Sequence, residues 1–411
     1  DKTVALSGTA TALAAALTGT VQDSSNDKIT GTVTITGANP TEAELKTIND
    51  GTNATIIVPD KTVQLSSTAD VLAAALTGTV KDSANAQITG NVTITDAPTE
   101  TELQTINNGT NASIQIPAAN QTFTASAAVL AAALTGTVTG PGAAALSGAV
   151  TVNNGANTNV AATLLSTIAT GTSGTVTVSA AVNITGDTSE VIAALDTNGV
   201  TAATANIVLS DTPSLANLKT INGKTSGSIK ISNGAVTYTD SAVNLAAALD
   251  GTVTDGSGTA LSGAMTLNTD PNATQLQTIN NGTTGNVIIP NAGITLSGTP
   301  AVLVEALTGS VATAGSAKIS GTVTITTSDP DSAQLKTIND AIDGAIVVPS
   351  KAVALTGTAT ALAAALTGTV TDSANAKIEG NVTITGSAPT EAELKTINDA
   401  TNASIQIPAA N

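Results

Sequence analysis

The hydrophobic positions of the chain follow two patterns that alternate from end to end. In the first pattern, Leu13 and Leu17 lie four residues apart among alanines, which places both leucines on one face of a short helix. Gly19 follows at the position where a left-handed residue ends a helix, and Thr9 or Thr11 can cap its start. Exact or looser copies begin at Leu13, Leu72, Leu130, Ile192, Leu245, Leu303 and Leu362.

A second helical pattern lies between the copies of the first. Leu45 and Ile48 supply its hydrophobic face, and residues 41–44 carry a capping-box signature, Thr-Glu-Ala-Glu. Glu42 and Lys46 lie one helical turn apart, so we expect them to pair. The copies are centred on Ile48, Ile106, Ile168, Ile221, Ile279, Ile338 and Ile397.

The segments between the helices alternate with a period of two, which predicts strands. Val33 and Ile35 point to one face, and the threonines around them point to the other. The repeating element is therefore strand, turn, strand and short helix, about 30 residues long, and the elements pair into double repeats of about 59 residues. We predict seven double repeats, at roughly 1–60, 61–118, 119–180, 181–233, 234–291, 292–350 and 351–411.

Two architectures can accommodate this repetition. Seven independent domains would need linkers, which the sequence lacks, and small cores built almost without large side chains. A single continuous α/β repeat solenoid of about 14 coils over residues 1–411 would let each coil bury its Ala, Leu, Val and Ile against its neighbours. We therefore predict the solenoid. Because paired strands lie about 4.8 Å apart and packed helices about 8–10 Å, the coils should curve, twist or carry tilted or very short helices.

Composition excludes several classes of function. The chain has no Cys, His, Trp or Arg, so it lacks an imidazole base, a thiol nucleophile and a typical zinc site, and we predict that it is not an enzyme. Its net charge of −17 argues against binding to nucleic acid or to an anionic membrane surface. No apolar run is long enough to span a bilayer, so we expect no membrane insertion.

Two sets of polar side chains are candidate binding sites. Four aspartates, Asp23, Asp82, Asp255 and Asp372, occupy the same turn after the first helix of a repeat. Stacked turns could hold Ca²⁺ through carboxylate and carbonyl oxygens, or each Asp could simply start its turn. No other cofactor is expected. The threonine faces of the strands could bind ice or carbohydrate, or they could be ordinary strand residues that face water.

Repeats three to five are the least regular part of the array. They contain Phe123, Tyr238 and Met265, and their spacings depart most from the average. The irregularity could be simple drift within the array or a specialised binding region.

The sequences at the two ends are in phase with each other. Residues 402–411 repeat residues 111–120, and residues 2–7 closely match residues 61–66, so the last strand stops where the first would continue. Neither end shows the polar cap that is usual in solenoids. We expect either a window cut from a longer repeat protein or self-association of subunits head to tail, a contact that generates filaments.

The alternation of residues 6–21 with residues 32–50 resembles the repeat regions of giant secreted cell-surface proteins, notably those of marine cyanobacteria. The resemblance covers the whole chain and carries over no site residue. It implies an extracellular or cell-surface role in adhesion, surface layers or motility. We predict an extracellular structural rod or filament subunit. The alternative is an adhesin-type module that uses a Thr-rich or Asp-lined face to bind a glycan, ice or calcium.

Overall fold

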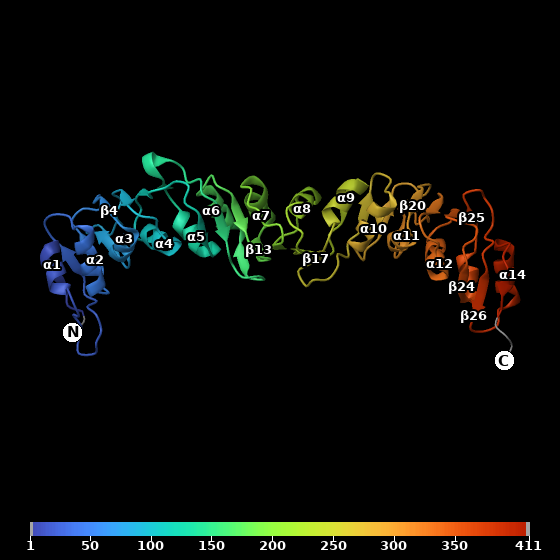
Figure 1. Cartoon of the computed structure of the whole chain (residues 1–411), viewed down its shortest axis with the longest axis horizontal. Coiled ribbons are helices and arrows are strands. Elements are labelled where there is room, and N and C mark those ends of the chain that lie inside the picture. Colours follow the sequence, from blue (N-terminus) through green and yellow to red (C-terminus); the bar gives the residue numbers. More distant parts are fainter. Residues whose placement is uncertain (1–2, 408–411) are drawn as a thin grey trace. The chain divides into compact units, whose positions relative to one another are not determined.

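The computed structural model describes residues 3–407, which form a mixed α/β structure of short helices and short parallel strands in small sheets. The chain divides between Asn206 and Ile207 into two compact units. Within each unit, helices and strands alternate in the order of the sequence (Figure 1). The α/β class and the repeating strand–helix pattern predicted from the sequence are confirmed. We use "module" for one strand–helix repeat of about 30 residues.

The helices have the two alternating characters that the sequence predicts. Odd-numbered helices carry the Leu-Ala-Ala-Ala-Leu pattern or a looser copy of it, and even-numbered helices carry the Leu-x-Thr-Ile-Asn pattern or its variants. The first unit contains α1 (Ala10–Leu17), α2 (Glu42–Gly51), α3 (Ala69–Leu76), α4 (Glu100–Gly109), α5 (Ala127–Leu134), α6 (Ala162–Thr170) and α7 (Thr188–Ile192), which a π-helical turn (Ala193–Thr197) extends. The second contains α8 (Leu215–Asn222), α9 (Ala242–Leu249), α10 (Ala273–Asn281), α11 (Pro300–Leu307), α12 (Ser332–Ala341), α13 (Ala359–Ala365) and α14 (Glu391–Ala400).

The strands of the first unit form small parallel sheets. They are β1 (Leu6–Gly8), β2 (Val33–Ile35), β3 (Ile56–Val58), β4 (Leu65–Ser67), β5 (Val80–Asp82), β6 (Val92–Ile94), β7 (Ile114–Gln115), β8 (Phe123–Ala125), β9 (Val138–Thr139), β10 (Val150–Val152), β11 (Asn159–Ala161), β12 (Val176–Val178) and β13 (Asn183–Gly186). Their orders are β1-β2-β3-β5, β4-β6-β7-β9, β8-β10-β12 and β11-β13.

The same pattern continues in the second unit, starting with β14 (Asn206–Leu209) at the division. Its other strands are β15 (Ile229–Ile231), β16 (Tyr238–Asp240), β17 (Val253–Asp255), β18 (Met265–Leu267), β19 (Val287–Ile289), β20 (Leu296–Gly298), β21 (Val311–Thr313), β22 (Val323–Ile325), β23 (Ile346–Val348), β24 (Leu355–Thr358), β25 (Val370–Asp372), β26 (Val382–Thr385) and β27 (Ile405–Gln406). The orders here are β14-β15-β17, β16-β18-β19-β21, β20-β22-β23-β25 and β24-β26-β27.

Each sheet buries one row of aliphatic side chains against the helices. In the first sheet the parallel register aligns Leu6, Val33, Ile56 and Val80. Val33 and Ile56 are fully buried, as are the inward-facing leucines and isoleucines of the even-numbered helices before α14. The core is a thin aliphatic layer. The two aromatic residues, Phe123 and Tyr238, are buried at the position that leucine occupies in other modules.

Two signals for the ends of helices are confirmed. Thr9 caps α1 by accepting a hydrogen bond from the N–H of Ala12, and Gly19 after α1 has φ +87°. The capping box predicted at residues 41–44 begins α2, and capping boxes also begin α4, α12 and α14.

The predicted pairing within α2 is wrong. Lys46 pairs with Asp50, one turn further on, at 2.5 Å. Glu42 instead accepts a hydrogen bond from the N–H of Ser66, in the strand before α3, at 2.5 Å. The partner of Glu42 is therefore a backbone N–H group of the next module, which the pattern within one helix does not predict.

Glycine allows neighbouring modules to approach closely where a turn enters a strand. A Cβ atom at Gly90 would lie 2.1 Å from the carbonyl oxygen of Val63, and one at Gly263 would lie 1.7 Å from that of Val236. Such distances leave no room for any side chain. Gly31, Gly148, Gly321 and Gly380 occupy the equivalent position.

Candidate functional site

The four aspartates proposed as calcium ligands lie in equivalent turns, and each carboxylate holds its own turn together. Oδ1 of Asp82 accepts hydrogen bonds from the N–H groups of Ala84 and Ala86 at 2.9 and 2.8 Å. Asp372 accepts the equivalent pair from Ala374 and Ala376 at the same two distances. These contacts are those of an Asp that starts a turn.

Asp23 and Asp255 repeat this geometry. Asp23 Oδ1 accepts from the N–H groups of Ser25 and Asp27 at 2.8 and 3.0 Å. Asp255 accepts from the Ser257 hydroxyl at 2.7 Å, which is the main cause that lowers the pKa of Asp255. Within residues 3–407, no cluster of three or more acidic side chains is arranged to hold a metal ion. Calcium binding by the four aspartates stays a prediction.

The outward-facing rows of the sheets are mixed in character. In the first sheet, Thr34 lies beside Ser7 on one side and Ile57 on the other, and Ile57 lies beside Lys81. One row differs: Thr124, Thr151, Thr177 and Thr201 are consecutive in the register of the third sheet and its adjoining bridge. A regular threonine face is therefore confined to one place in the first unit rather than repeated in every sheet.

The side chains that might have served catalysis make structural contacts. Glu44 belongs to the capping box of α2 and accepts a hydrogen bond from the Thr11 hydroxyl at 2.6 Å. That hydroxyl is the largest cause that lowers the pKa of Glu44, followed by the N–H of Thr41. Lys318 lies near Ser316 in the sequence, but its Nζ atom donates to the carbonyl oxygen of Asp340 at 2.6 Å, at the end of α12.

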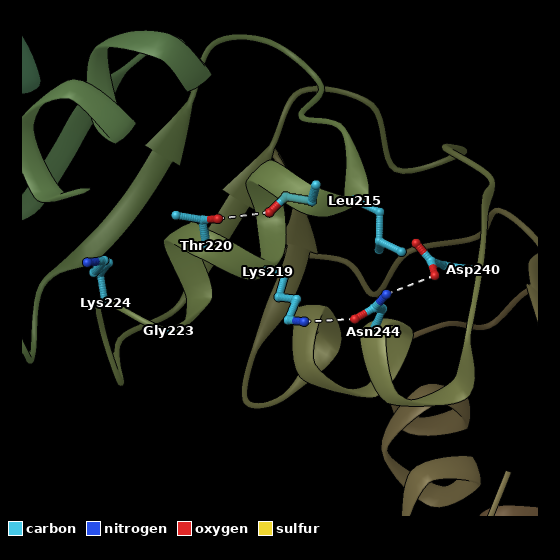
Figure 2. Close-up of a pocket in the computed structure, with 8 residues that line it drawn as sticks. Leu215, Lys219, Thr220, Gly223, Lys224, Asp240 and Asn244 are labelled. Carbon is cyan, nitrogen blue, oxygen red and sulfur yellow. Dashed lines mark hydrogen bonds between the residues drawn. The ribbon is translucent and has the colours of Figure 1, made fainter. Parts of the chain in front are cut away.

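A hollow of about 440 Å³ lies on the second unit. It is lined by α8 and the residues just after it, by Asp240 at the end of β16 and by Asn244 of α9 (Figure 2). Lys219 Nζ donates to Asn244 Oδ1 at 2.7 Å, and Asn244 Nδ2 donates to Asp240 Oδ1 at 2.9 Å. The Asn244 amide is the main cause that lowers the pKa of Asp240. On the far side, the Thr220 hydroxyl donates to the carbonyl of Ala216 within α8. The Lys219–Asn244 hydrogen bond therefore joins α8 to α9, and the other two hydrogen bonds are local.

A row of asparagines, which the sequence reasoning did not single out, joins five even-numbered helices within residues 3–407 to the odd-numbered helix that follows each of them. Asn107, at the end of α4, donates through Nδ2 to the carbonyl oxygens of Ala132 and Thr135 at the end of α5, both at 2.7 Å. Carbonyl groups at a helix end have no partner within the helix, so the amide satisfies groups that would otherwise need water. The equivalent residues are Asn49, Asn222, Asn280 and Asn339.

The signal for this row was present in the sequence as the fifth residue of the Leu-x-Thr-Ile-Asn pattern. Ala169 replaces the asparagine in α6. This is also the place where the next helix, α7, is short and passes into a π-helical turn. The irregular third double repeat therefore lacks a contact that its neighbours share.

None of the helices in residues 3–407 has the length and hydrophobicity needed to cross a membrane. Comparison with known protein families finds no family model that matches the chain, and comparison with curated proteins finds no significant relative.

Proposed function

We propose that this chain is a structural repeat protein whose modules stack as the coils of one α/β solenoid, and that it serves as a rod or filament subunit outside the cell. The observation that carries the proposal is the repeated contact between an even-numbered helix and the helix after it. Within residues 3–407, an asparagine amide at the same position of the helix bonds the same two carbonyl positions in five places.

Three further features support a structural role. The backbone hydrogen bonds between modules repeat in register, as in Ile56 N–H to Thr79 O and Ile114 N–H to Thr137 O. Glycines allow the modules to approach to a distance at which no Cβ fits. The acidic and lysine side chains described above form hydrogen bonds within turns, helix caps and contacts between modules. Such nearest-neighbour contacts are what stabilise repeats that are too small to fold alone.

The extracellular placement is supported by composition and by the resemblance to secreted repeat proteins. A net charge of −17 is suited to keeping a secreted polymer in solution. Immunogold labelling of intact producing cells tests this placement. Label at the cell surface is expected, and label confined to the cell interior would contradict it.

Electron microscopy of the purified chain, with and without Ca²⁺, tests the solenoid. A continuous particle of even width is expected in both conditions. Separate globules joined by thin connections would contradict the solenoid and favour independent domains.

The threonine row of the first unit supports a second candidate function, an adhesin-type site for a glycan or ice. Thr124, Thr151, Thr177 and Thr201 are adjacent in register, so their hydroxyl groups repeat at about the 4.8 Å strand spacing. Thr177→Lys should abolish binding in glycan-array and ice-affinity measurements. Thr324→Lys in the second unit should leave it intact, because Val347 interrupts the row there. Equal binding by both variants would exclude this row.

A further inference from the structure

We propose that the C-terminal end of one copy of this chain binds the N-terminal end of a second copy, in the register that joins an even-numbered helix to the next module within the chain. The proposal rests on the structural role proposed above and names its partner. The tail face is formed by Glu391, Leu394, Lys395, Asn398, Ile405 and Ile407, and the head face by Val4, Leu6, Ala12, Ala15, Ala16 and Val21.

The tail face exposes positions that are buried elsewhere in the chain. Ile407 is 58% exposed, whereas the equivalent Ile116 and Val348 are fully buried. Leu394 on α14 is half-buried, whereas the equivalent Leu45, Leu103 and Leu335 are fully buried. The four helical residues of the tail face follow the i, i+3, i+4, i+7 spacing of a single stripe.

The tail face is also hollowed. Its six residues line a depression of about 510 Å³ beside β27. Asn398 occupies the position of the five asparagines that bond to the next helix, and within residues 3–407 its side chain makes no hydrogen bond. The face therefore combines a hollow that contains three aliphatic side chains with the amide that elsewhere joins two modules.

The head face shows the complementary loss of burial. Ala16 is exposed, whereas Ala75, Ala133, Ala248, Ala306 and Ala365, its counterparts in five other odd-numbered helices, are fully buried. Val4 is 47% exposed, whereas its counterparts Val63 and Val353 are buried. α1 carries the same small alanines as α3, which packs against α2.

The internal repetition fixes the register of the proposed contact. Ile56 pairs with Val80, Ile114 with Val138, Ile229 with Val253 and Ile346 with Val370. Val21 is the counterpart of these valines, and in the described residues it belongs to no strand. Ile405 of one copy should therefore pair with Val21 of the next.

Polar contacts follow from the same correspondence. Asn398 should donate to the carbonyl oxygens of Ala15 and Thr18 of the second copy, as Asn49 does to Ala74 and Thr77. Glu391 should accept from the N–H of Ser7, as Glu42 accepts from Ser66 and Glu100 from Thr124. The contact therefore offers partners for an edge strand, an amide and a carboxylate together with apolar burial.

The first experiment measures the mass of the purified 411-residue chain by sedimentation between roughly 1 and 200 µM, a range that spans typical weak to moderate affinities. The wild-type chain is expected to form species larger than one chain as its concentration rises. Ala16→Glu in the head and Ile407→Lys in the tail should each leave only single chains. Ala301→Glu and Val243→Lys, at exposed positions of α11 and α9, are the matched controls and should associate as the wild type does.

Mixing the two interface variants tests the direction of the contact. The head variant keeps an intact tail and the tail variant keeps an intact head, so an equal mixture should form heterodimers and nothing larger. Association of either variant alone would overturn the proposal, as would a wild-type chain that stays single throughout the range.

Cross-linking tests the register itself. The chain has no cysteine, so no native thiol competes with the cysteines that are introduced in pairs. Under oxidation, Val21→Cys chains mixed with Ile405→Cys chains should form covalent heterodimers. Val21→Cys with Gln406→Cys should not, because neighbouring residues of a strand point to opposite faces. Equal cross-linking in both mixtures would contradict the register.

The two proposals fail separately. Continuous particles in electron micrographs of a chain that never associates would overturn this inference and leave the solenoid intact. Register-specific cross-linking between chains that consist of separate globules would overturn the solenoid and leave this inference intact.

Discussion

The side-chain amide of Asn107 lies 2.7 Å from the carbonyl oxygen of Ala132, which is 25 residues further along the chain. The same amide also reaches Thr135, so one side chain satisfies two carbonyl groups at the end of α5. Its repetition at equivalent sites makes this contact the joint between neighbouring helices.

Asn107→Ala should destabilise the chain, because it removes the donor from the partly buried contact with the Ala132 carbonyl and from the exposed contact with the Thr135 carbonyl. We expect the free energy of unfolding to fall by about 1–3 kcal/mol. Urea denaturation followed by circular dichroism measures the change. Asn108→Ala, at the exposed neighbouring position, is the control and should change stability by less than about 0.5 kcal/mol. Equal effects of the two substitutions would show that the amide contact is dispensable.

Gly263→Ala should be costly because the added methyl group would overlap the Val236 carbonyl oxygen at 1.7 Å. Overpacking of this kind typically costs about 1–3 kcal/mol and sometimes more. Gly256→Ala is the control, since a Cβ there has no neighbour closer than 3.9 Å. Thermal melts compare the stability of the two variants. A Gly263→Ala chain as stable as the Gly256→Ala control would contradict the close approach of modules.

Tyr238 should make stability fall at alkaline pH. Burial raises the pKa of its hydroxyl from 10.0 to about 12. Between these values the unfolded chain has lost the proton that the folded chain keeps, so the free energy of unfolding should fall by at most about 2–3 kcal/mol.

Tyr238→Phe removes the ionisable group and should abolish this fall between pH 10 and pH 12. At neutral pH the variant should be about 1 kcal/mol less stable, because the Pro213 carbonyl loses the hydroxyl that donates to it at 3.0 Å. Urea titrations at neutral pH, pH 10 and pH 12 measure the two effects. An alkaline fall of the same size in the Phe variant would assign it to the lysines instead.

Glu44 should contribute to stability at neutral pH and lose that contribution in acid. The Thr11 hydroxyl and the N–H of Thr41 hold its pKa below 4.5 in the folded chain. The carboxylate contact is therefore present above the unfolded-state pKa and is lost as the pH falls through the folded-state pKa. Thr11→Val should raise the pKa of Glu44, as observed by carboxyl NMR, whereas Thr101→Val should leave it unchanged. An unshifted Glu44 in the Thr11 variant would contradict this assignment.

Much of the fold could be predicted because its signals are local. The capping box of Thr41 and Glu44, the glycine at position 19 and the alternation of Val33 and Ile35 each act over a few residues. Repetition then reinforced each signal at the equivalent positions along the chain.

The contacts between modules could not be predicted in the same way. Glu42 has a lysine one helical turn away, yet it bonds to the N–H of Ser66, 24 residues later. Asn49 has no local partner that distinguishes it from any exposed asparagine. Only the spatial proximity of neighbouring modules gives these residues their partners. Their recurrence at one position of the repeat was the available signal.

Mechanical unfolding of single chains, pulled from both ends, tests the continuous solenoid most directly. Because each module depends on its neighbours, we predict small successive extensions of about one module, roughly 10 nm each at about 3.5 Å per residue. Seven separate unfolding events of roughly 20 nm, one for each double repeat, would show that the double repeats are independent domains and would contradict the solenoid.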